Sequence, residues 1–267
     1  MAGTLAERRA AFAARLCPPR DGPGKPATLG DAQGFPLRGL LFGGTPETID
    51  CIFLHGGGYV MGSPAAQRVL AGRLAEHLGR TLFAVEYPRA PEAVWPAPLE
   101  AVCALLRRLR QPVLLVGSSA GGHLALNAAL RMPRRVRRLV LFSPNTDRSG
   151  LSHTRGPNTE LDAMNADAGD RELWETAMPD ALPDSPEASP VLADLSRLPP
   201  CFLSATEGEV LLGDTLLLAR RLAELKRPHA VRIAPFDRAG LHMFESWPDV
   251  LPEGDEAVRA AAEFCLN

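Results

Sequence analysis

The amino-acid sequence predicts one α/β domain in which helices flank a mostly parallel central sheet. Three observations indicate this class. Short apolar runs alternate along the chain with segments of helical length and spacing, which is typical of a parallel sheet covered on both faces. The chain has 267 residues, of which 46% are hydrophobic, and this suffices for a single large core. Glycine-rich segments follow two of the apolar runs, where parallel strands turn into helices.

The elements can be assigned in order from the N-terminus. Thr4 and Glu7 have the spacing of a capping box, so we expect a short helix that ends near Leu16. Residues 17–34 are rich in proline and glycine, which predicts a loop. The apolar runs that follow predict strands at residues 37–42, 49–54, 81–86, 113–116, 138–142, 201–205 and 230–235. Helix-like segments predict helices at residues 65–78, 99–109, 121–130, 214–225 and 255–264.

One long segment, residues 145–198, interrupts the alternation and is rich in Pro, Asp, Asn and Ser. Loops of this length in a compact domain are usually functional, often as lids. Between residues 145 and 190, ten acidic residues stand against three arginines. The segment also carries apolar side chains that need a buried environment: Leu161, Met164, Leu173, Trp174 and Met178. We therefore expect a small helical insertion over the catalytic face, whose negative charge would repel anionic substrates.

Charge and cysteine content exclude several classes of protein. A net charge of −2 leaves no electrostatic footprint for nucleic acid over the whole chain. The five cysteines are odd in number and scattered, which argues against a disulfide framework or a zinc site and favours a reducing compartment. Glu7, Arg8 and Arg9 lie where a signal peptide needs an unbroken apolar stretch, and no segment approaches the ~18 apolar residues of a membrane span. We expect a cytoplasmic protein with no metal and with no nucleic-acid or membrane partner.

Two glycine-rich motifs point to nucleophilic catalysis. Residues 117–122 follow the apolar run VLLV and contain G-x-S-x-G, in which Ser119 would occupy a tight strand-to-helix turn. Residues 55–58, of sequence HGGG, follow the run IDCIFL, and their amides can approach a reacting oxygen closely because glycine lacks a Cβ. Each motif alone could be an ordinary glycine-rich turn. Together, and in this order, they predict a nucleophile and the donors for the oxyanion that its attack creates.

A serine hydroxyl is a poor nucleophile unless a base removes its proton. Four histidines follow Ser119 in the chain. His123 lies on the helix that begins at the motif itself, His153 lies in the insertion, and His229 opens a strand at its wrong end. His242 lies in a loop after the last strand and before the last helix, and it is the expected base.

The base in turn needs a carboxylate that fixes its tautomer. The loop after the strand CFLSA offers three: Glu207, Glu209 and Asp214. Glu209 lies in the middle of the turn, where a side chain can reach the histidine loop, and it is favoured. The position of Asp214 is also explained by a structural role as the N-cap of the next helix, and Glu207 directly follows the strand. Both stay open as alternatives for the acid.

These motifs resemble those of the hormone-sensitive-lipase-like branch of the α/β-hydrolases, which includes many bacterial carboxylesterases. The resemblance covers the chain from about residue 37 to its end. The family's HGGG matches residues 55–58, its YRLAPE resembles YPRAPE at 87–92, and its GDSAGG matches GSSAGG at 117–122. Its D-P-L aligns with EVL at 209–211, and its H-x-F with HMF at 242–244. Ser118 replaces the aspartate of the third motif, and Glu209 replaces that of the fourth.

The resemblance implies the α/β-hydrolase fold with a cap insertion. Residues 37–144 and 199–267 would form the core, and residues 145–198 would form the cap insertion. Residues 1–36 would be an N-terminal helix and loop that make a shortened part of the cap, which leaves the acyl pocket more open. No cofactor is implied.

The resemblance also implies roles for single residues. Ser119 would attack the acyl carbon, His242 would shuttle its proton, and Glu209 would orient His242. The oxyanion hole would be formed by three backbone N–H groups: those of Gly57, Gly58 and Ala120. His55 would brace the loop, and His123 stands where the family usually has asparagine, as a packed helix residue or a substrate contact.

The leading functional prediction is a serine carboxylesterase that acts on esters of small or medium acyl groups. A tailoring hydrolase or acyltransferase with an amide, thioester or lactone substrate is a second reading, because the chemistry up to the acyl-enzyme is shared. A ligand-binding member of the fold without catalysis is a third, and the presence of His242 argues against it. The expected partner is a small-molecule acyl substrate, and a homodimer is compatible with all three readings.

Overall fold

The structure is a computed structural model, and it describes residues 3–16, 22–32, 35–235 and 241–267. Its centre is an eight-stranded sheet in the order β1-β2-β4-β3-β5-β6-β7-β8. The strands are β1 (Lys25–Ala32), β2 (Phe35–Phe42), β3 (Ile49–Leu54), β4 (Thr81–Val85), β5 (Val113–Ser118), β6 (Val136–Phe142), β7 (Cys201–Thr206) and β8 (His229–Ala234). All pairs from β4 to β8 are parallel, whereas β2 is antiparallel to both β1 and β4. The mostly parallel sheet expected from the sequence is therefore confirmed.

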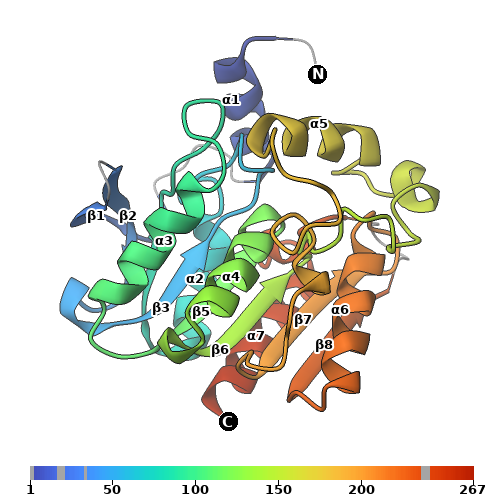
Figure 1. The fold of residues 1–267 in the computed structure, drawn as a ribbon. Helices are drawn as coiled ribbons and strands as arrows, with labels where there is room; N and C mark the ends of the chain where they lie inside the picture. Colours follow the sequence, from blue (N-terminus) through green and yellow to red (C-terminus); the bar gives the residue numbers. More distant parts are fainter. Residues whose placement is uncertain (1–2, 17–21, 33–34, 236–240) are drawn as a thin grey trace.

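The described residues contain seven α-helices: α1 (Leu5–Leu16), α2 (Arg68–Leu78), α3 (Ala97–Arg108), α4 (Ala120–Arg131), α5 (Asp167–Ala177), α6 (Leu212–Glu224) and α7 (Pro252–Leu266). Helices α2 and α7 pack together on one face, and α3, α4 and α6 cover the other (Figure 1). None of the helices in the described part of the chain is long and apolar enough to cross a membrane.

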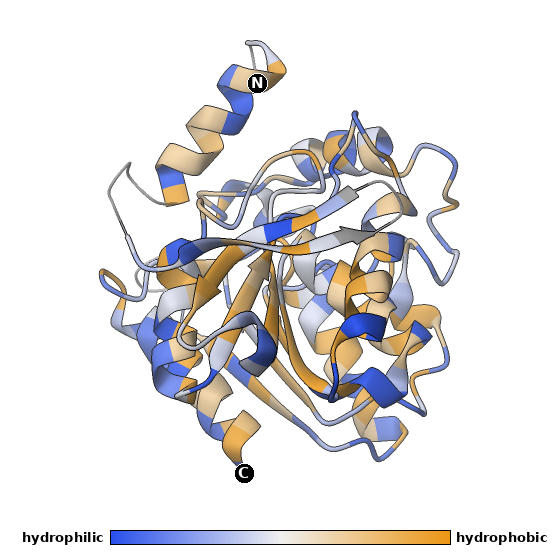
Figure 2. Ribbon diagram, turned by 90° about the vertical axis from the view of Figure 1, so that its left-hand side faces the viewer, coloured by the Kyte–Doolittle hydropathy of each residue, from blue (hydrophilic) through white to orange (hydrophobic). Residues whose placement is uncertain are grey.

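The core consists of two apolar layers, one on each face of the sheet. Successive residues of a strand point to opposite faces, so Ile52 and Leu54 of β3 join the layer under α3 and α4. Cys51 and Phe53 join the layer under α2 and α7. The central strands are apolar throughout because both of their faces are covered, and they are the orange arrows inside Figure 2.

The N-terminal region differs from the sequence expectation. Thr4 and Glu7 do form a capping box, with the Thr4 amide donating to Glu7 at 2.7 Å and the Glu7 amide donating to Thr4 at 3.3 Å. Residues 25–32, however, were expected within a loop and instead form β1, paired with β2. Strand β1 is the edge of the sheet, where a strand tolerates Pro26 and Gly30. Residues 17–21 and 33–34 of the expected loop lie outside the described residues.

Two helices lie apart from the layers and above the sheet. Helix α1 and helix α5, the helix of the insertion, stand together at the top of Figure 1, near the ends of β5, β6 and β7. Arg8 of α1 donates to Glu172 of α5 at 3.0 Å. The long insertion therefore contains a helix, as expected, and it meets the N-terminal helix over one edge of the sheet.

Candidate active site

Ser119 occupies the sharp turn between β5 and α4. Its backbone, with φ 54° and ψ −119°, lies in a region that residues other than glycine rarely adopt. Small neighbours make this turn feasible, because a Cβ at Gly117 would lie 2.1 Å from the Gly121 carbonyl oxygen. A Cβ at Gly121 would lie equally close to the carbonyl oxygen of Leu54. The expected strand-to-helix turn is therefore present, and it presents Ser119 at the carboxyl edge of the sheet.

His242 lies against Ser119, with 2.8 Å between its Nε2 and the Ser119 Oγ. It follows β8 and precedes the short 3-10 turn of Phe244–Ser246. Burial lowers the pKa of His242 below its usual 6.5, so the ring is neutral at neutral pH and can accept a proton. Of the four histidines weighed from the sequence, this is the one whose ring contacts the Ser119 hydroxyl.

The carboxylate of Glu209 is the one that faces the far side of the His242 ring. Glu209 Oε2 lies 3.9 Å from His242 Nδ1, which is an ion-pair distance but longer than a hydrogen bond. Neither His242 Nδ1 nor Glu209 Oε1 has a hydrogen-bond partner among the described residues. Because both atoms are buried, a small side-chain rotation that joins them would satisfy both at once.

The two alternatives for the acid lie elsewhere. Glu207 is exposed at the end of β7. Asp214 is fully buried and accepts the amides of Thr146 and Asp147, each at 2.8 Å, and a bond from Arg155 at 2.7 Å. Its proposed part as an N-cap is wrong, because α6 begins at Leu212 and its cap residue is Leu211. Asp214 instead fastens the start of the insertion to α6.

A second buried glutamate, Glu245, lies beside Glu209 and was not anticipated. Ser143 Oγ donates to Glu209 Oε2 at 2.8 Å, and Ser204 Oγ donates to Glu245 Oε1. Burial first, and then the Glu245 carboxyl, raise the pKa of Glu209 well above its usual 4.5. Burial raises the pKa of Glu245 to about 7. Residues 242–246, of sequence HMFES, carry no pattern that predicts this pair. The two glutamates come together only through the order of the strands in the sheet.

The glycine-rich loop after β3 lies next to Ser119. Gly57 and Gly58 both have positive φ, at 120° and 60°, and a Cβ at Gly56 would lie 3.1 Å from the Cβ of Ser119. In the described part of the chain, no acceptor is bonded to the main-chain amides of the three expected oxyanion-hole residues: Gly57, Gly58 and Ala120. A loop that combines these conformations with unbonded amides can hold an oxyanion close to the Ser119 hydroxyl.

His55 stabilises that loop from behind. Its ring stacks on Tyr87, with centroids 4.2 Å apart and planes inclined by 11°. Its Nδ1 lies 2.9 Å from the carbonyl oxygen of Gly56, and Tyr87 Oη donates to the His55 carbonyl at 2.6 Å. Burial lowers the pKa of His55 to about 3, so the ring is neutral. These contacts agree with a bracing role and keep His55 away from the pocket.

His123 is also packed inside the protein. Its Nδ1 lies 2.7 Å from the hydroxyl of Tyr59, the residue after the glycine loop, and burial lowers its pKa to about 3. His123 lines a small cavity of about 10 Å³ beside Gly58 and Ala120, closed by Trp174. That volume holds about one water molecule. Of the two readings of His123, the packed helix residue fits the structure.

A pocket of about 420 Å³ opens over Ser119 and His242. Its floor includes Gly57 and Gly58, and its roof comes from α1 and from residues 162–173 of the insertion. A volume of this size suits a small-molecule ligand. Among the described residues, no three His, Cys, Asp or Glu side chains gather in a way that could hold a metal ion.

The acidic residues of the roof are largely paired with arginines. Asp170 accepts Arg155 at 2.7 Å and also Arg148, and Glu172 accepts Arg8 at 3.0 Å. Arg148 and Arg155 belong to the insertion, whereas Arg8 comes from α1. The charges of Asp170 and Glu172 are offset within the roof, and the expected repulsion of anionic substrates stays a prediction.

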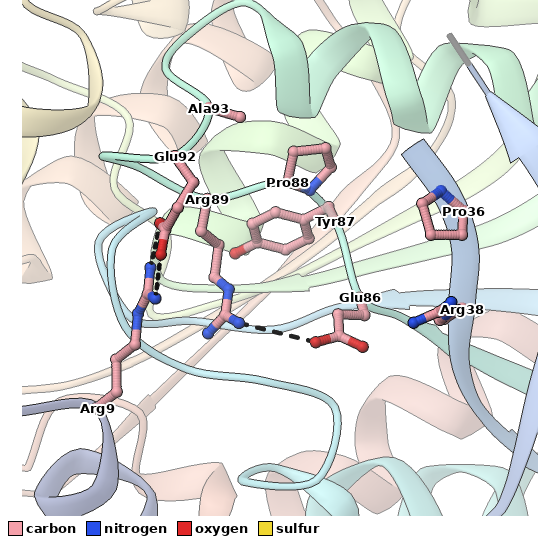
Figure 3. Close-up of a pocket in the computed structure, with 9 residues that line it drawn as sticks. All are labelled: Arg9, Pro36, Arg38, Glu86, Tyr87, Pro88, Arg89, Glu92 and Ala93. Atoms are coloured by element: carbon pink, nitrogen blue, oxygen red, sulfur yellow. Dashed lines mark hydrogen bonds and ion pairs between the residues drawn. The ribbon is translucent and has the colours of Figure 1, made fainter. Parts of the chain in front are cut away.

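A second cavity, of about 300 Å³, lies away from Ser119 and shows how α1 is attached (Figure 3). Arg9 of α1 reaches Glu92 with two bonds of 2.7 Å, and its Nε donates to the carbonyl oxygen of Val60 at 2.8 Å. Arg89 lies beside Glu86 on the opposite side of this cavity, at 3.8 Å. The arginine of α1 thus ties the roof to the segment that directly follows the glycine loop.

Comparisons with known proteins agree with this geometry. Residues 51–242 match a family model described as the alpha/beta hydrolase fold. A protein named acetyl-hydrolase from Streptomyces hygroscopicus is 34% identical over 228 residues, which cover 80% of this chain and 74% of the relative. A protein named esterase from Acinetobacter venetianus is 29% identical over 229 residues, covering 80% and 73%. The crystal structure of an esterase from the bacterial hormone-sensitive lipase family superposes with a TM-score of 0.88 at 27% identity, over 99% of this chain and 91% of the other.

Proposed function

We propose that this chain, which belongs to the alpha/beta hydrolase fold family and to its hormone-sensitive-lipase-like esterases, cleaves carboxylic esters through an acyl-enzyme on Ser119. The observation that carries the proposal is the 2.8 Å contact between Ser119 Oγ and His242 Nε2 at the floor of the pocket. A hydroxyl in a strained turn, a neutral imidazole at hydrogen-bond distance and a glycine loop with unbonded amides together supply the parts of acyl transfer.

The reaction would proceed in two halves. Ser119 Oγ attacks the ester carbonyl carbon while His242 Nε2 takes the hydroxyl proton, and the amides of Gly57, Gly58 and Ala120 bind the oxyanion. His242 then gives its proton to the leaving alcohol. A water molecule then attacks the acyl carbon while His242 takes one of its protons. The bond between the acyl carbon and Ser119 Oγ breaks as His242 returns the proton to that oxygen, and the carboxylic acid leaves. Glu209 would hold the ring and stabilise the imidazolium that forms twice in each cycle.

Small or medium acyl groups fit this site best. The recess beside Gly58 and Ala120 holds only about 10 Å³, because Tyr59, His123 and Trp174 fill it. The larger volume, about 420 Å³, lies under the roof and has walls of mixed polarity, including Arg8 and Asp162. We infer that the space for the acyl chain is short and closed at its end, and that the described residues form no apolar channel for a long lipid tail.

The division into a core and a cap belongs to this proposal. Residues 37–144 and 199–267 would form the core, to which β1 contributes its edge strand, and α1 with residues 145–198 would form the cap. A cytoplasmic location and a homodimer stay predictions, which cell fractionation and light scattering on the purified protein test.

The proposal is tested with a panel of p-nitrophenyl esters of increasing acyl length. We expect kcat/KM to be highest for short or medium chains, and Ser119→Ala to lower kcat by about 10³-fold or more. Ser118→Ala is the matched control, because Ser118 is adjacent and also buried, yet it contacts Gln67 rather than His242. A preference for long chains would contradict the acyl assignment. Faster turnover of amides, thioesters or lactones would favour the tailoring hydrolase, and no turnover at all would favour the ligand-binding reading.

A further inference from the structure

Asp162 belongs to the insertion, yet its carboxylate is bonded to both loops that carry the proposed acid and base. Its Oδ1 accepts the main-chain amide of His242 at 3.1 Å. Its Oδ2 accepts the amide of Val210, the residue that follows Glu209, at 3.0 Å. These partners lie 80 and 48 residues away along the chain. One side chain thus bonds directly to the backbone of both loops.

The Asp162 carboxylate is itself held rigidly. Its Oδ1 also accepts the amides of Met164 at 3.0 Å and of Asn165 at 3.1 Å, and the residue is only 7% exposed. Asn158, one turn earlier, donates from its side chain to the Glu209 carbonyl oxygen at 2.9 Å. Because the segment 158–165 closes on itself, it forms a preorganised bracket against the two loops.

The charge of Asp162 also bears on the proposed base. Charged groups from several elements act on His242: Glu209, Asp162, Asp170, Asp214 and Arg155. Burial lowers the pKa of His242, and Asp162 is the strongest of the charges that oppose this shift. During acyl transfer the ring becomes an imidazolium, so a fixed negative charge on this side favours the transition state.

We propose that Asp162 is a positioning residue of the site, through which the cap insertion holds the Glu209 and His242 loops at the distance that proton transfer requires. The inference rests on the proposed function, since it assigns Asp162 a task within that reaction. Asp162 lines the pocket, but its two oxygens are already occupied by four amides, so it acts on substrate turnover through His242 and not by binding the substrate.

The test compares Asp162→Asn with Asp180→Asn. The asparagine keeps one acceptor but turns an N–H group toward the Val210 amide and removes the charge. Asp180 undergoes the same chemical change in the same insertion, where it is exposed. We expect Asp162→Asn to lower kcat by about 10- to 100-fold with KM nearly unchanged, as misplaced catalytic groups do. Asp180→Asn should match the wild type.

The pH dependence of kcat/KM distinguishes two roles for Asp162. In one it positions His242 and acts on it through its charge, and in the other it is purely structural. Removal of the Asp162 charge disfavours the imidazolium and lowers the pKa of His242, so the acid limb of kcat/KM should move to lower pH in Asp162→Asn. A wild-type kcat with an unmoved acid limb would overturn the inference. So would a raised KM at unchanged kcat, which would make Asp162 a substrate contact, or an equal loss in Asp180→Asn.

Hydrogen exchange on the wild-type protein covers the case in which Asp162→Asn does not fold. Peptides that contain the Val210 and His242 amides should exchange slowly, and rapid exchange at both would contradict the bracket. The failure of this inference and that of the proposed function are distinguishable. An active wild type with an unaffected Asp162→Asn variant overturns the bracket alone, whereas a wild type that hydrolyses no ester overturns the proposed function and the bracket with it.

Discussion

At the residue scale, the charge inside the site depends on the protonation of two buried glutamates. Glu209 and Glu245 are both inaccessible to solvent, and the serines that bond them are joined through the Ser143 amide and the Ser204 carbonyl at 2.9 Å. An apolar enclosure opposes charge on either carboxyl, and the first charge to form opposes the second. The proposed role of Glu209 requires its carboxylate form, and a protonated Glu245 favours that form because the two buried charges oppose each other. The protonation of Glu245 therefore bears on the charge of the proposed acid.

Glu245→Gln should stabilise the protein at high pH relative to low pH. The folded-state pKa of Glu245, about 7, lies above the usual 4.5. Its carboxyl therefore favours the folded state below about pH 4.5, and this contribution is lost as the pH rises through 7. Glutamine suffers no such loss. The gain in the free energy of unfolding should grow between pH 4.5 and 8 and reach at most about 3 kcal/mol. Urea unfolding at both pH values measures it.

Glu175→Gln provides the comparison for this experiment, because Glu175 is exposed on α5. Glu175→Gln makes the same chemical change at an exposed position and so controls for the substitution itself. A difference between Glu245→Gln and the wild type that does not change with pH would show that the Glu245 carboxyl has the same pKa in the folded and the unfolded protein.

At the element scale, the site depends on how α1 is attached to the sheet. Arg8, Phe12 and Arg15 of this helix line the pocket, while Arg9 on its other side holds Glu92 and the Val60 carbonyl. Arg9 is a planar donor with two bonds to one carboxylate, which fixes direction as well as distance. The Arg9 guanidinium therefore helps to set the position of one pocket wall, beside the bonds of Arg8 to Glu172 and of Arg15 to the Ala163 carbonyl.

Arg9→Ala should raise KM more than it lowers kcat. Without the anchor, α1 loses its bonds to Glu92 and Val60, and the pocket loses a defined wall, while Ser119 and His242 keep their places on the sheet. Steady-state kinetics on a short-chain ester measure the two constants. Arg220→Ala is the control, because Arg220 makes an exposed ion pair with Glu224 on α6, where such pairs contribute little. A loss confined to kcat would indicate that α1 acts on the reacting groups instead.

Most elements could be predicted from the sequence, and the exceptions have physical reasons. The buried parallel strands β3 to β7 produce continuous apolar runs, because both of their faces are covered. Strand β1 produces no such run, since an antiparallel edge strand needs neither apolar faces nor freedom from proline. The prediction that Asp214 is an N-cap is wrong for a related reason. Its side chain is used across the structure, by Thr146 and Arg155, and not by the helix it was expected to cap.

The candidate site could be predicted where local motifs define it. The turn at Ser119 and the loop at Gly57 require small residues in fixed order, so both can be recognised in the sequence. His242 follows by position after the last strand. Asp162 and Glu245 could not be found this way, because their partners lie 41 to 80 residues away and only the folded chain brings them together.

At the scale of the whole molecule, the parallel sheet gathers the site along one edge. The carboxyl ends of parallel strands lie together, so the turn after β5, the loop after β7 and the loop after β8 meet there although they are distant in sequence. The insertion and α1 then close the space above them and leave the pocket of about 420 Å³. In the proposed reaction the core provides the reacting groups, and the roof sets which substrates reach them.

The central claim is that Ser119 is an activated nucleophile. Intact-mass spectrometry after treatment with a fluorophosphonate tests it most directly, because this reagent forms a stable bond only with a serine that a neighbouring base activates. The account predicts one adduct on the wild type, mapped to Ser119, one adduct on Ser118→Ala, and none on Ser119→Ala. A wild-type protein that takes up no adduct, or an adduct that persists in Ser119→Ala, would contradict it.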